Sequence, residues 1–243
     1  MELRGRAALV TGAGRRLGSA IAYALSEQGM SVAIHHHESV EDAERLRAKI
    51  RRQGGVAECF AADLTDAAQA RDLPVRVASR LGRLDVLINS AGIMKRLTVE
   101  ETSPEAWDEI FNLNLRACFF CAQGALPALR EAKGRIINLA DVGGLEPWPR
   151  YAAHCISKAG VVMLTKILAR TCAPDVTVNA VAPGAVLPPD DWDEASREHL
   201  RRTTPLQRLG SPADVVNAIL FLLRSGDYVT GETLVVDGGR MIR

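Results

Sequence analysis

Three side chains in the second half of the chain, Asp141, His154 and Lys158, could together transfer a proton. His154 and Lys158 are four residues apart, so on a helix they share one face. An imidazole with a pKa of about 6.5 can give or take a proton near neutral pH. A carboxylate at Asp141 would favour the charged imidazole, whereas the ammonium of Lys158 would oppose it. The spacing predicts an acid–base centre; the alternative is that His154 is a helix residue without a catalytic role.

A glycine-rich turn lies near the start of the chain. Gly12, Gly14 and Gly18 separate an apolar run at residues 7–10 from an amphipathic stretch at residues 19–28. Glycines let the backbone approach a phosphate, and the free N–H groups of the first helical turn then face the anion. Strand, glycine turn and helix in this order therefore predict a pyrophosphate site.

The composition is balanced in charge and rich in apolar residues. The 243 residues include 30 basic and 29 acidic side chains, and 47% are hydrophobic. These values predict one domain over residues 1–243 and no binding surface for nucleic acid or an anionic membrane. We expect a cytoplasmic protein, because no apolar signal segment precedes the first strand and no stretch reaches the roughly 18 apolar residues of a spanning helix. The five cysteines are odd in number, so we expect no disulfide framework.

Apolar strands alternate with helices along the whole chain. This alternation predicts a parallel sheet covered on both faces, a doubly wound, Rossmann-like α/β fold. Strands are expected at residues 7–10, 31–35, 57–62, 84–88, 135–139, 176–181 and 233–236. Helices are expected at residues 19–28, 40–52, 66–81, onward from about 104, 151–169 and 211–223. We expect the third helix to be kinked or split at Pro74 and residues 185–204 to form a lid over the site.

The sequence resembles the short-chain dehydrogenase/reductase family over essentially its whole length. The matching motifs are Thr11-Gly12-x-x-x-Arg16-x-Gly18, Asp63-Leu64, Asn89-Ser90-Ala91-Gly92, Asn114-Leu115, Lys158, Asn179 to Gly184, Thr230-Gly231 and Val236 to Gly239. Arg16 and Asp141 further resemble the pteridine reductase branch. Most members of the whole family have glycine at the first of these positions and serine at the second. The resemblance implies hydride transfer between a nicotinamide cofactor and a small molecule.

The resemblance also implies roles for single residues. Asp63 would bind the adenine amine, Lys158 would hold the nicotinamide ribose and tune the proton donor, and Asn114 would hold a water beside that lysine. The implied cofactor-binding residues are Gly12, Gly14, Arg15, Arg16, Leu17, Gly18, His36, His37, Asp63, Leu64, Asn89, Ser90, Ala91, Gly92, Lys158, Pro183, Gly184 and Val186. The implied catalytic residues are Asn114, Asp141, His154 and Lys158. Asn89 and Asn179 could instead only tie strands and loops together.

Two positions depart from the family pattern, and a third departs from that of the pteridine reductase branch. His154 stands where the family has its tyrosine proton donor, and Pro188 stands where it has serine or threonine. Ile93 occupies the position of a phenylalanine that stacks on the pterin in pteridine reductases. We favour a working His154 because Asp141, Lys158 and Asn114 all accompany it. Tyr151, one helical turn earlier, is an alternative donor.

Three consecutive histidines, His35 to His37, end the second strand. Successive strand residues point to opposite faces and no third ligand is evident, so we expect no metal site. This is the rim where the adenosine ribose would lie, and the histidines with Arg15 favour the 2′-phosphate of NADP(H). Glu38 favours the ribose hydroxyls of NAD(H), which is the alternative cofactor.

The sequence thus predicts an NADP(H)-dependent reductase of a small carbonyl or of a pterin-like, imine-type ring. The alternative is a protein that binds the cofactor without turnover, as a redox or regulatory sensor. The resemblance implies a homotetramer, with a dimer as the alternative, since family members pair two helices across two-fold axes and both helices here carry apolar residues beyond those that the sheet needs. These residues are Phe111, Phe119, Phe120, Val161, Val162 and Leu164.

Overall fold

Seven parallel strands form one sheet in the order β3-β2-β1-β4-β5-β6-β7. The computed structural model describes residues 1–187 and 193–242 of the chain. The strands are β1 (Ala7–Val10), β2 (Ser31–His36), β3 (Ala57–Ala61), β4 (Val86–Asn89), β5 (Arg135–Leu139), β6 (Thr177–Pro183) and β7 (Thr233–Val236). Each begins and ends within two residues of its expected bounds. The single-domain, doubly wound fold is therefore confirmed.

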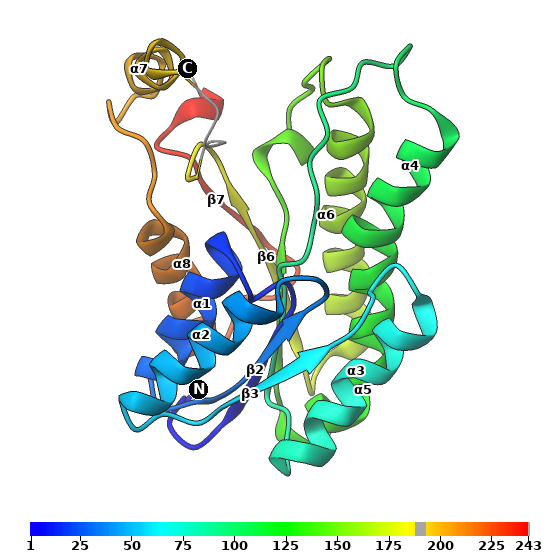
Figure 1. Ribbon diagram of the computed structural model, residues 1–243, viewed down its shortest axis with the longest axis vertical. Helices are drawn as coiled ribbons and strands as arrows, with labels where there is room; N and C mark the ends of the chain where they lie inside the picture. The colour runs from blue at the N-terminus through cyan, green and yellow to red at the C-terminus, as the bar shows by residue number, and fades with distance from the viewer. Residues whose placement is uncertain (188–192, 243) are drawn as a thin grey trace.

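Helices cover both faces of the sheet (Figure 1). On one face lie α1 (Arg16–Glu27), α2 (Val40–Arg52) and α8 (Pro212–Arg224). On the other face lie α3 (Ala67–Leu81), α5 (Ala117–Ala132) and α6 (Ala152–Cys172). The remaining helical segments are α4 (Pro104–Phe111), η1 (Asn112–Arg116), η2 (Val142–Gly144), α7 (Glu194–Thr203) and η3 (Arg240–Ile242). Each face of the sheet thus has its own apolar core.

The strand order reverses at β1, which pairs with β2 on one side and with β4 on the other. In open parallel sheets the crevice outside the carboxyl ends of the strands at such a switch point is where ligands bind. The glycine turn follows β1, and the turn of residues 89–92 follows β4. The fold therefore brings both motifs to the same crevice.

The expected split at Pro74 is wrong, since α3 runs through this residue as one helix. The side chain of Pro74 is buried, and α3 packs so closely on α5 that a side chain at Gly124 would meet the backbone of Arg71. This tertiary packing outweighs the one hydrogen bond that proline removes. The long helix expected from Pro104 has an irregularity of its own, the π-helical turn η1.

Helix α6 is the one helix of residues 1–187 and 193–242 that is long and apolar enough to cross a membrane. More than half of its apolar window is buried, which is typical of a core helix. Val161 and Leu164, which we expected on its outer surface, lie in the core at 0% and 6% exposure. The exposed apolar residues of α6 are instead Ile156, Met163 and Ile167.

Candidate active site

A cavity of about 500 Å³ opens at the switch point, between the glycine turn and the ends of the neighbouring strands. The predicted site residues that line it are Gly12, Arg15, Arg16, Leu17, Gly18, His36, His37, Asp63, Leu64, Ser90, Ala91, Gly92, Asp141, His154, Lys158, Pro183, Gly184 and Val186. Gly14, Asn89 and Asn114 do not line it. The cavity thus joins motifs that are up to about 170 residues apart in the chain, from Gly12 to Val186.

Several lining residues were missed by sequence reasoning. They are Ser39, Thr65, Leu113, Leu139 and Ala140, whereas Leu187 belongs to the expected lid. No motif marks them, although Leu139 and Ala140 could have been found as the residues where β5 ends. Residues 188–192, within the expected lid and including Pro188, lie outside the part of the chain that the structure describes.

The glycine turn is shaped by close backbone contacts. Gly12 has φ of 64°, and a Cβ there would lie 2.9 Å from the Cα of Ala91. A Cβ at Gly18 would lie 2.3 Å from the carbonyl oxygen of Gly12. Gly14 packs against Ser39, whose Oγ would be 2.2 Å from a Cβ. Gly12 and Gly18 are therefore required by space, because a Cβ would meet backbone atoms, and Gly12 also by its conformation. At Gly14 a Cβ would meet a serine hydroxyl, which can rotate away.

The first turn of α1 meets the cavity. The helix begins at Arg16, and its N-cap residue Arg15 makes no side-chain capping hydrogen bond. The first N–H groups of a helix have no partner within it, and the helix dipole places partial positive charge there. Arg16, Leu17 and Gly18 line the cavity, so this end of it suits a phosphate group.

His154 lies in the cavity wall and is 4% exposed. Its Nδ1 is 3.3 Å from the carbonyl oxygen of Ile93, and its Nε2 is 3.9 Å from Oδ2 of Asp141. Nε2 is buried without a hydrogen-bond partner. An unpaired buried polar atom costs free energy unless a ligand or water satisfies it. The geometry therefore leaves one imidazole nitrogen available for a ligand.

Asp141 is held so that its second oxygen faces His154. Its Oδ1 accepts a hydrogen bond of 2.7 Å from the backbone N–H of Gly143, as the N-cap of η2. Gly144 in η2 packs on α6, since a Cβ there would lie 2.7 Å from the carbonyl carbon of Lys158. This close packing brings a carboxylate from the end of β5 to the helix that carries His154 and Lys158.

Lys158 is buried at 8% exposure, and its Nζ donates a hydrogen bond of 2.7 Å to the carbonyl oxygen of Leu139. Burial lowers the pKa of this ammonium below its ordinary value, whereas the thiol of Cys118 and the carboxylate of Asp141 act to raise it. A Cβ at Gly92 would lie 3.7 Å from Nζ, so the turn after β4 approaches the amine closely. Lys158 is thus a fixed donor in the cavity wall.

Asn114 lies in the π-helical turn and is fully buried. Its Oδ1 accepts from the backbone N–H of Ile93 at 2.8 Å, and its Nδ2 donates to the carbonyl oxygen of Ile93 at 2.9 Å. Nδ2 also lies 3.1 Å from the hydroxyl oxygen of Ser157. Because the Ile93 carbonyl contacts His154, Asn114 fixes the peptide that orients the imidazole. A π-turn at such a position is typical of functional sites.

Two other asparagines contact neighbouring segments. Asn89 donates from Nδ2 to Oδ1 of Asn138 at 2.9 Å, next to the turn after β4. Asn179 donates to the carbonyl oxygen of Val229 and accepts from the N–H of Glu232. The cofactor role expected of Asn89 stays a prediction.

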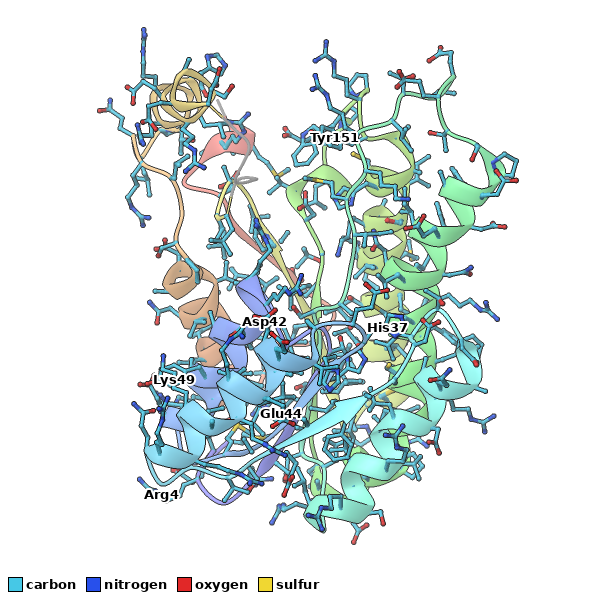
Figure 2. All side chains as sticks on the ribbon, in the orientation of Figure 1. Arg4, His37, Asp42, Glu44, Lys49 and Tyr151 are labelled. Atoms are coloured by element: carbon cyan, nitrogen blue, oxygen red, sulfur yellow. The ribbon has the colours of Figure 1, made fainter. Side chains whose placement is uncertain are left out.

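The rim at the end of β2 carries charged and polar side chains. Arg15 donates from Nε to Oδ2 of Asp42 on α2, and His37 and Glu38 are exposed. Figure 2 shows Asp42 and His37 near the start of α2, far from Tyr151 in the upper part of the view. Tyr151 does not line the cavity. Among the described residues no three His, Cys, Asp or Glu side chains form a cluster with metal-binding geometry.

The sequence is similar to known reductases over nearly its whole length. The family profile described as enoyl-(acyl carrier protein) reductase matches residues 12–240. The 3-oxoacyl-(acyl-carrier-protein) reductase FabG of Staphylococcus aureus is 38% identical over 239 residues, which cover 96% of this chain and 97% of the relative. The 3-oxoacyl-(acyl-carrier-protein) reductase of Synechocystis sp. is 36% identical over 99% of this chain and 98% of its own.

Solved structures match equally well. A dehydrogenase/reductase from Sinorhizobium meliloti superposes with a TM-score of 0.92 at 34% identity, over 98% of this chain and 97% of the other. A variant of a short-chain dehydrogenase/reductase from Serratia marcescens gives 0.92 at 30% identity, over 99% of both chains. The chain belongs to the short-chain dehydrogenase/reductase family. It is an oxidoreductase of that type.

Proposed function

We propose that this protein is an NADP(H)-dependent reductase of a small-molecule carbonyl group, with His154 as the proton donor. The observation that carries this proposal is the buried, unpartnered Nε2 of His154, which lies in the cavity wall together with Asp141 and Lys158. A decayed site has no reason to keep a polar atom in this costly state. The 3-oxoacyl substrates in the names of the relatives support a carbonyl substrate.

The described residues fit a nicotinamide dinucleotide. The first turn of α1 would hold the pyrophosphate, and Asp63 would lie at the adenine end. Lys158 would donate a hydrogen bond from Nζ to a ribose hydroxyl oxygen. Gly92 leaves the approach to Lys158 open. The bound cofactor supplies the hydride. The protein supplies position, charge and the proton.

His154 can deliver that proton through Nε2. If Nδ1–H donates to the carbonyl of Ile93, the ring orientation is fixed and Nε2 carries the exchangeable proton. Asp141 at 3.9 Å attracts the cationic imidazole, and Asn114 holds the Ile93 peptide in place. During reduction the imidazolium gives the Nε2 proton to the oxygen of the reduced carbonyl, and it regains a proton from solvent.

A ring C=N bond of a pterin-like substrate is the second candidate. Asp141 favours it, because a carboxylate is an acceptor and would pair with a ring N–H but would repel a carbonyl oxygen. Ile93 offers no aromatic surface on which such a ring could stack. The two candidates therefore differ in what the free oxygen of Asp141 contacts.

NADP(H) is preferred to NAD(H) in this proposal because Arg15 lies at the rim beside the end of β2. Asp42 pairs with Nε of Arg15 and would therefore hold the guanidinium near the ribose. The other N–H groups of Arg15 would then bind a 2′-phosphate. Glu38, which would favour NAD(H), is exposed.

We further propose a cytoplasmic homotetramer. The exposed apolar residues Phe119, Ile156, Met163 and Ile167 lie on α5 and α6, where a second copy would cover them. Light scattering at micromolar concentration should give four times the monomer mass. A monomeric mass would contradict this assembly.

A substrate panel tests the reaction. The purified protein is mixed with NADPH or NADH and a 3-oxoacyl thioester, a diketone, a quinone or a dihydropterin, and absorbance at the nicotinamide band is followed alongside a binding titration. Turnover of the thioester or diketone supports the carbonyl proposal, and turnover of the dihydropterin alone supports the second candidate. Tight NADPH binding without turnover of any compound supports a cofactor-binding sensor instead.

A further inference from the structure

His35, near the end of β2, is 2% exposed and has no part in the proton transfer described above. It lies beneath the glycine turn. The backbone N–H of Gly12 donates to its Nδ1 at 2.9 Å, and the N–H of Ala13 donates to its carbonyl oxygen at 2.8 Å. Two successive amides of the phosphate-binding turn are thus held by one residue of the neighbouring strand.

The other ring nitrogen defines the state of this imidazole. Nε2 lies 3.1 Å from the carbonyl oxygen of Ala62, which can only accept, so Nε2 carries the hydrogen. Nδ1 is then the lone-pair acceptor that the amide of Gly12 requires. Burial lowers the pKa of His35 to about 4, the Ala62 carbonyl acts against this, and the nearby His36, His37 and Arg76 lower it further. The ring is therefore neutral near pH 7.

The contacts of Gly12 connect this hydrogen bond to the pyrophosphate site. Gly12 is in the left-handed region with φ of 64°, and its carbonyl oxygen packs against Gly18 in the first turn of α1. A rotation of the Gly12 peptide would therefore move the first turn of α1, where Leu17 and Gly18 line the cavity. Backbone amides bind phosphate only when several of them point at it together.

We propose that His35 is a positioning residue for the pyrophosphate of the bound dinucleotide, acting through its Nδ1 on the amide of Gly12. This inference rests on the proposed cofactor function. It makes the first of the three histidines part of the phosphate site, through one ring contact to the turn and one to the carbonyl of Ala62. A glutamine or an asparagine at this position can each keep only one of the two ring contacts.

Two substitutions separate those contacts. His35→Asn places an amide oxygen where Nδ1 lies and loses the contact with Ala62. His35→Gln extends toward Ala62 and leaves the Gly12 amide without an acceptor. We expect His35→Asn to bind NADPH within about threefold of the wild type and His35→Gln to bind it at least about tenfold more weakly, because an unpaired buried amide is the costlier loss. Affinity is measured by fluorescence titration, and the melting temperature is recorded for each variant.

Binding of 2′-AMP, which lacks the pyrophosphate, distinguishes a positioning role of His35 from a merely structural one. If His35 acts on the phosphate turn, His35→Gln should bind 2′-AMP as tightly as the wild type does. Equal weakening of NADPH in both variants, or equal weakening of NADPH and 2′-AMP in His35→Gln, would overturn the inference. If His35→Gln does not fold, weak NADPH binding by a folded His35→Asn overturns it just as well. Failure of the wild type to bind NADPH at all would count against the proposed function rather than against His35.

Discussion

The two ends of the cavity are built in different ways. At the glycine turn the groups that would bind the cofactor are backbone amides. The close packing of this turn requires that Gly12 and Gly18 have no side chains. At the other end the groups that would act on the substrate are the side chains of His154, Asp141 and Lys158. His154 and Lys158 contact backbone carbonyls of other segments, and Asp141 accepts from the backbone N–H of Gly143, two residues along the chain. In the proposed function, phosphate recognition would thus depend on chain geometry and the reaction on residue identity.

This difference bears on which part of the site tolerates substitution. A Cβ at Gly18 would overlap the carbonyl oxygen of Gly12, so no other residue fits there. At position 154 the side chain lies in the cavity wall, so a substitution there changes the reacting group and leaves the backbone of the glycine turn unaltered. A change at position 154 therefore tests the proposed reaction separately from the phosphate site.

The largest expected effect follows from removing the imidazole. In His154→Ala we expect kcat to fall by about 10²–10⁴-fold, the contribution of a positioned general acid, while the Kd of NADPH stays within about threefold. The measurement is steady-state turnover of a substrate found in the panel, with NADPH titration in parallel. His199→Ala, at an exposed histidine of α7, is the matched control and should leave both values unchanged. Loss of NADPH binding equal to the loss of kcat would show that the two ends are not separate.

The second prediction concerns His35, at the phosphate end of the cavity, and the pH dependence of the free energy of unfolding. The pKa of His35 is lowered by burial to about 4 in the folded state and returns to about 6.5 on unfolding. Between these values the unfolded chain binds more protons, so the free energy of unfolding should be full at pH 7 and fall as the pH drops from 6.5 to 4. At about 1.4 kcal/mol per pH unit the loss is at most about 3 kcal/mol.

Urea unfolding at several pH values measures this loss. His35→Asn, which has no ring to protonate, should show a shallower fall over the same pH range than the wild type. Identical slopes for the two proteins would mean that other groups cause the acid sensitivity and that the imidazole is not held neutral by burial.

The fold was largely predictable because it depends on local patterns. Apolar runs such as residues 135–139 and turns such as residues 89–92 carry their own periodicity and glycine content, and the structure places them as expected. The helix boundaries at Pro104 and Ser211 were also visible, since serine and proline there begin helices α4 and α8.

The pairings within the site were less predictable. The hydrogen bond from Gly12 to His35 and the ion pair of Arg15 with Asp42 join residues 23 and 27 positions apart. Such contacts depend on side-chain rotamers and on the exact approach of two strands or helices, which no local pattern encodes. The hydrogen bond between Asn114 and the backbone of Ile93 is of the same kind. The sequence identified Asn114 as a site residue but did not identify Ile93 as its partner.

A smaller effect concerns cofactor choice at the rim. We expect Arg15→Ala to weaken NADPH by more than about tenfold and NADH little, because each charge-assisted hydrogen bond to the 2′-phosphate contributes about 1.5–3 kcal/mol. Arg47→Ala is the matched control, since this arginine of α2 pairs with Glu44. Titration of each variant with both cofactors gives the answer. Equal affinity of the wild type for NADPH and NADH, or equal weakening of both in Arg15→Ala, would make Glu38 the determinant and NAD(H) the cofactor.

The smallest expected effect comes from exchanging one proton donor for another. His154→Tyr places a phenol in a site where Nε2 is already buried and lies 3.9 Å from Asp141. The longer side chain must displace neighbours or push toward the substrate, and overpacking of this kind is costly. A phenol also gains less than an imidazole from the carboxylate, because it cannot become a cation. We therefore expect kcat on the native substrate to fall by about tenfold, less than after removal of the acid.

Turnover of His154→Tyr and the wild type is compared from pH 5 to 9. A higher rate for His154→Tyr would mean that the site is a decayed tyrosine site, and equal rates for the wild type, His154→Tyr and His154→Ala would mean that residue 154 transfers no proton.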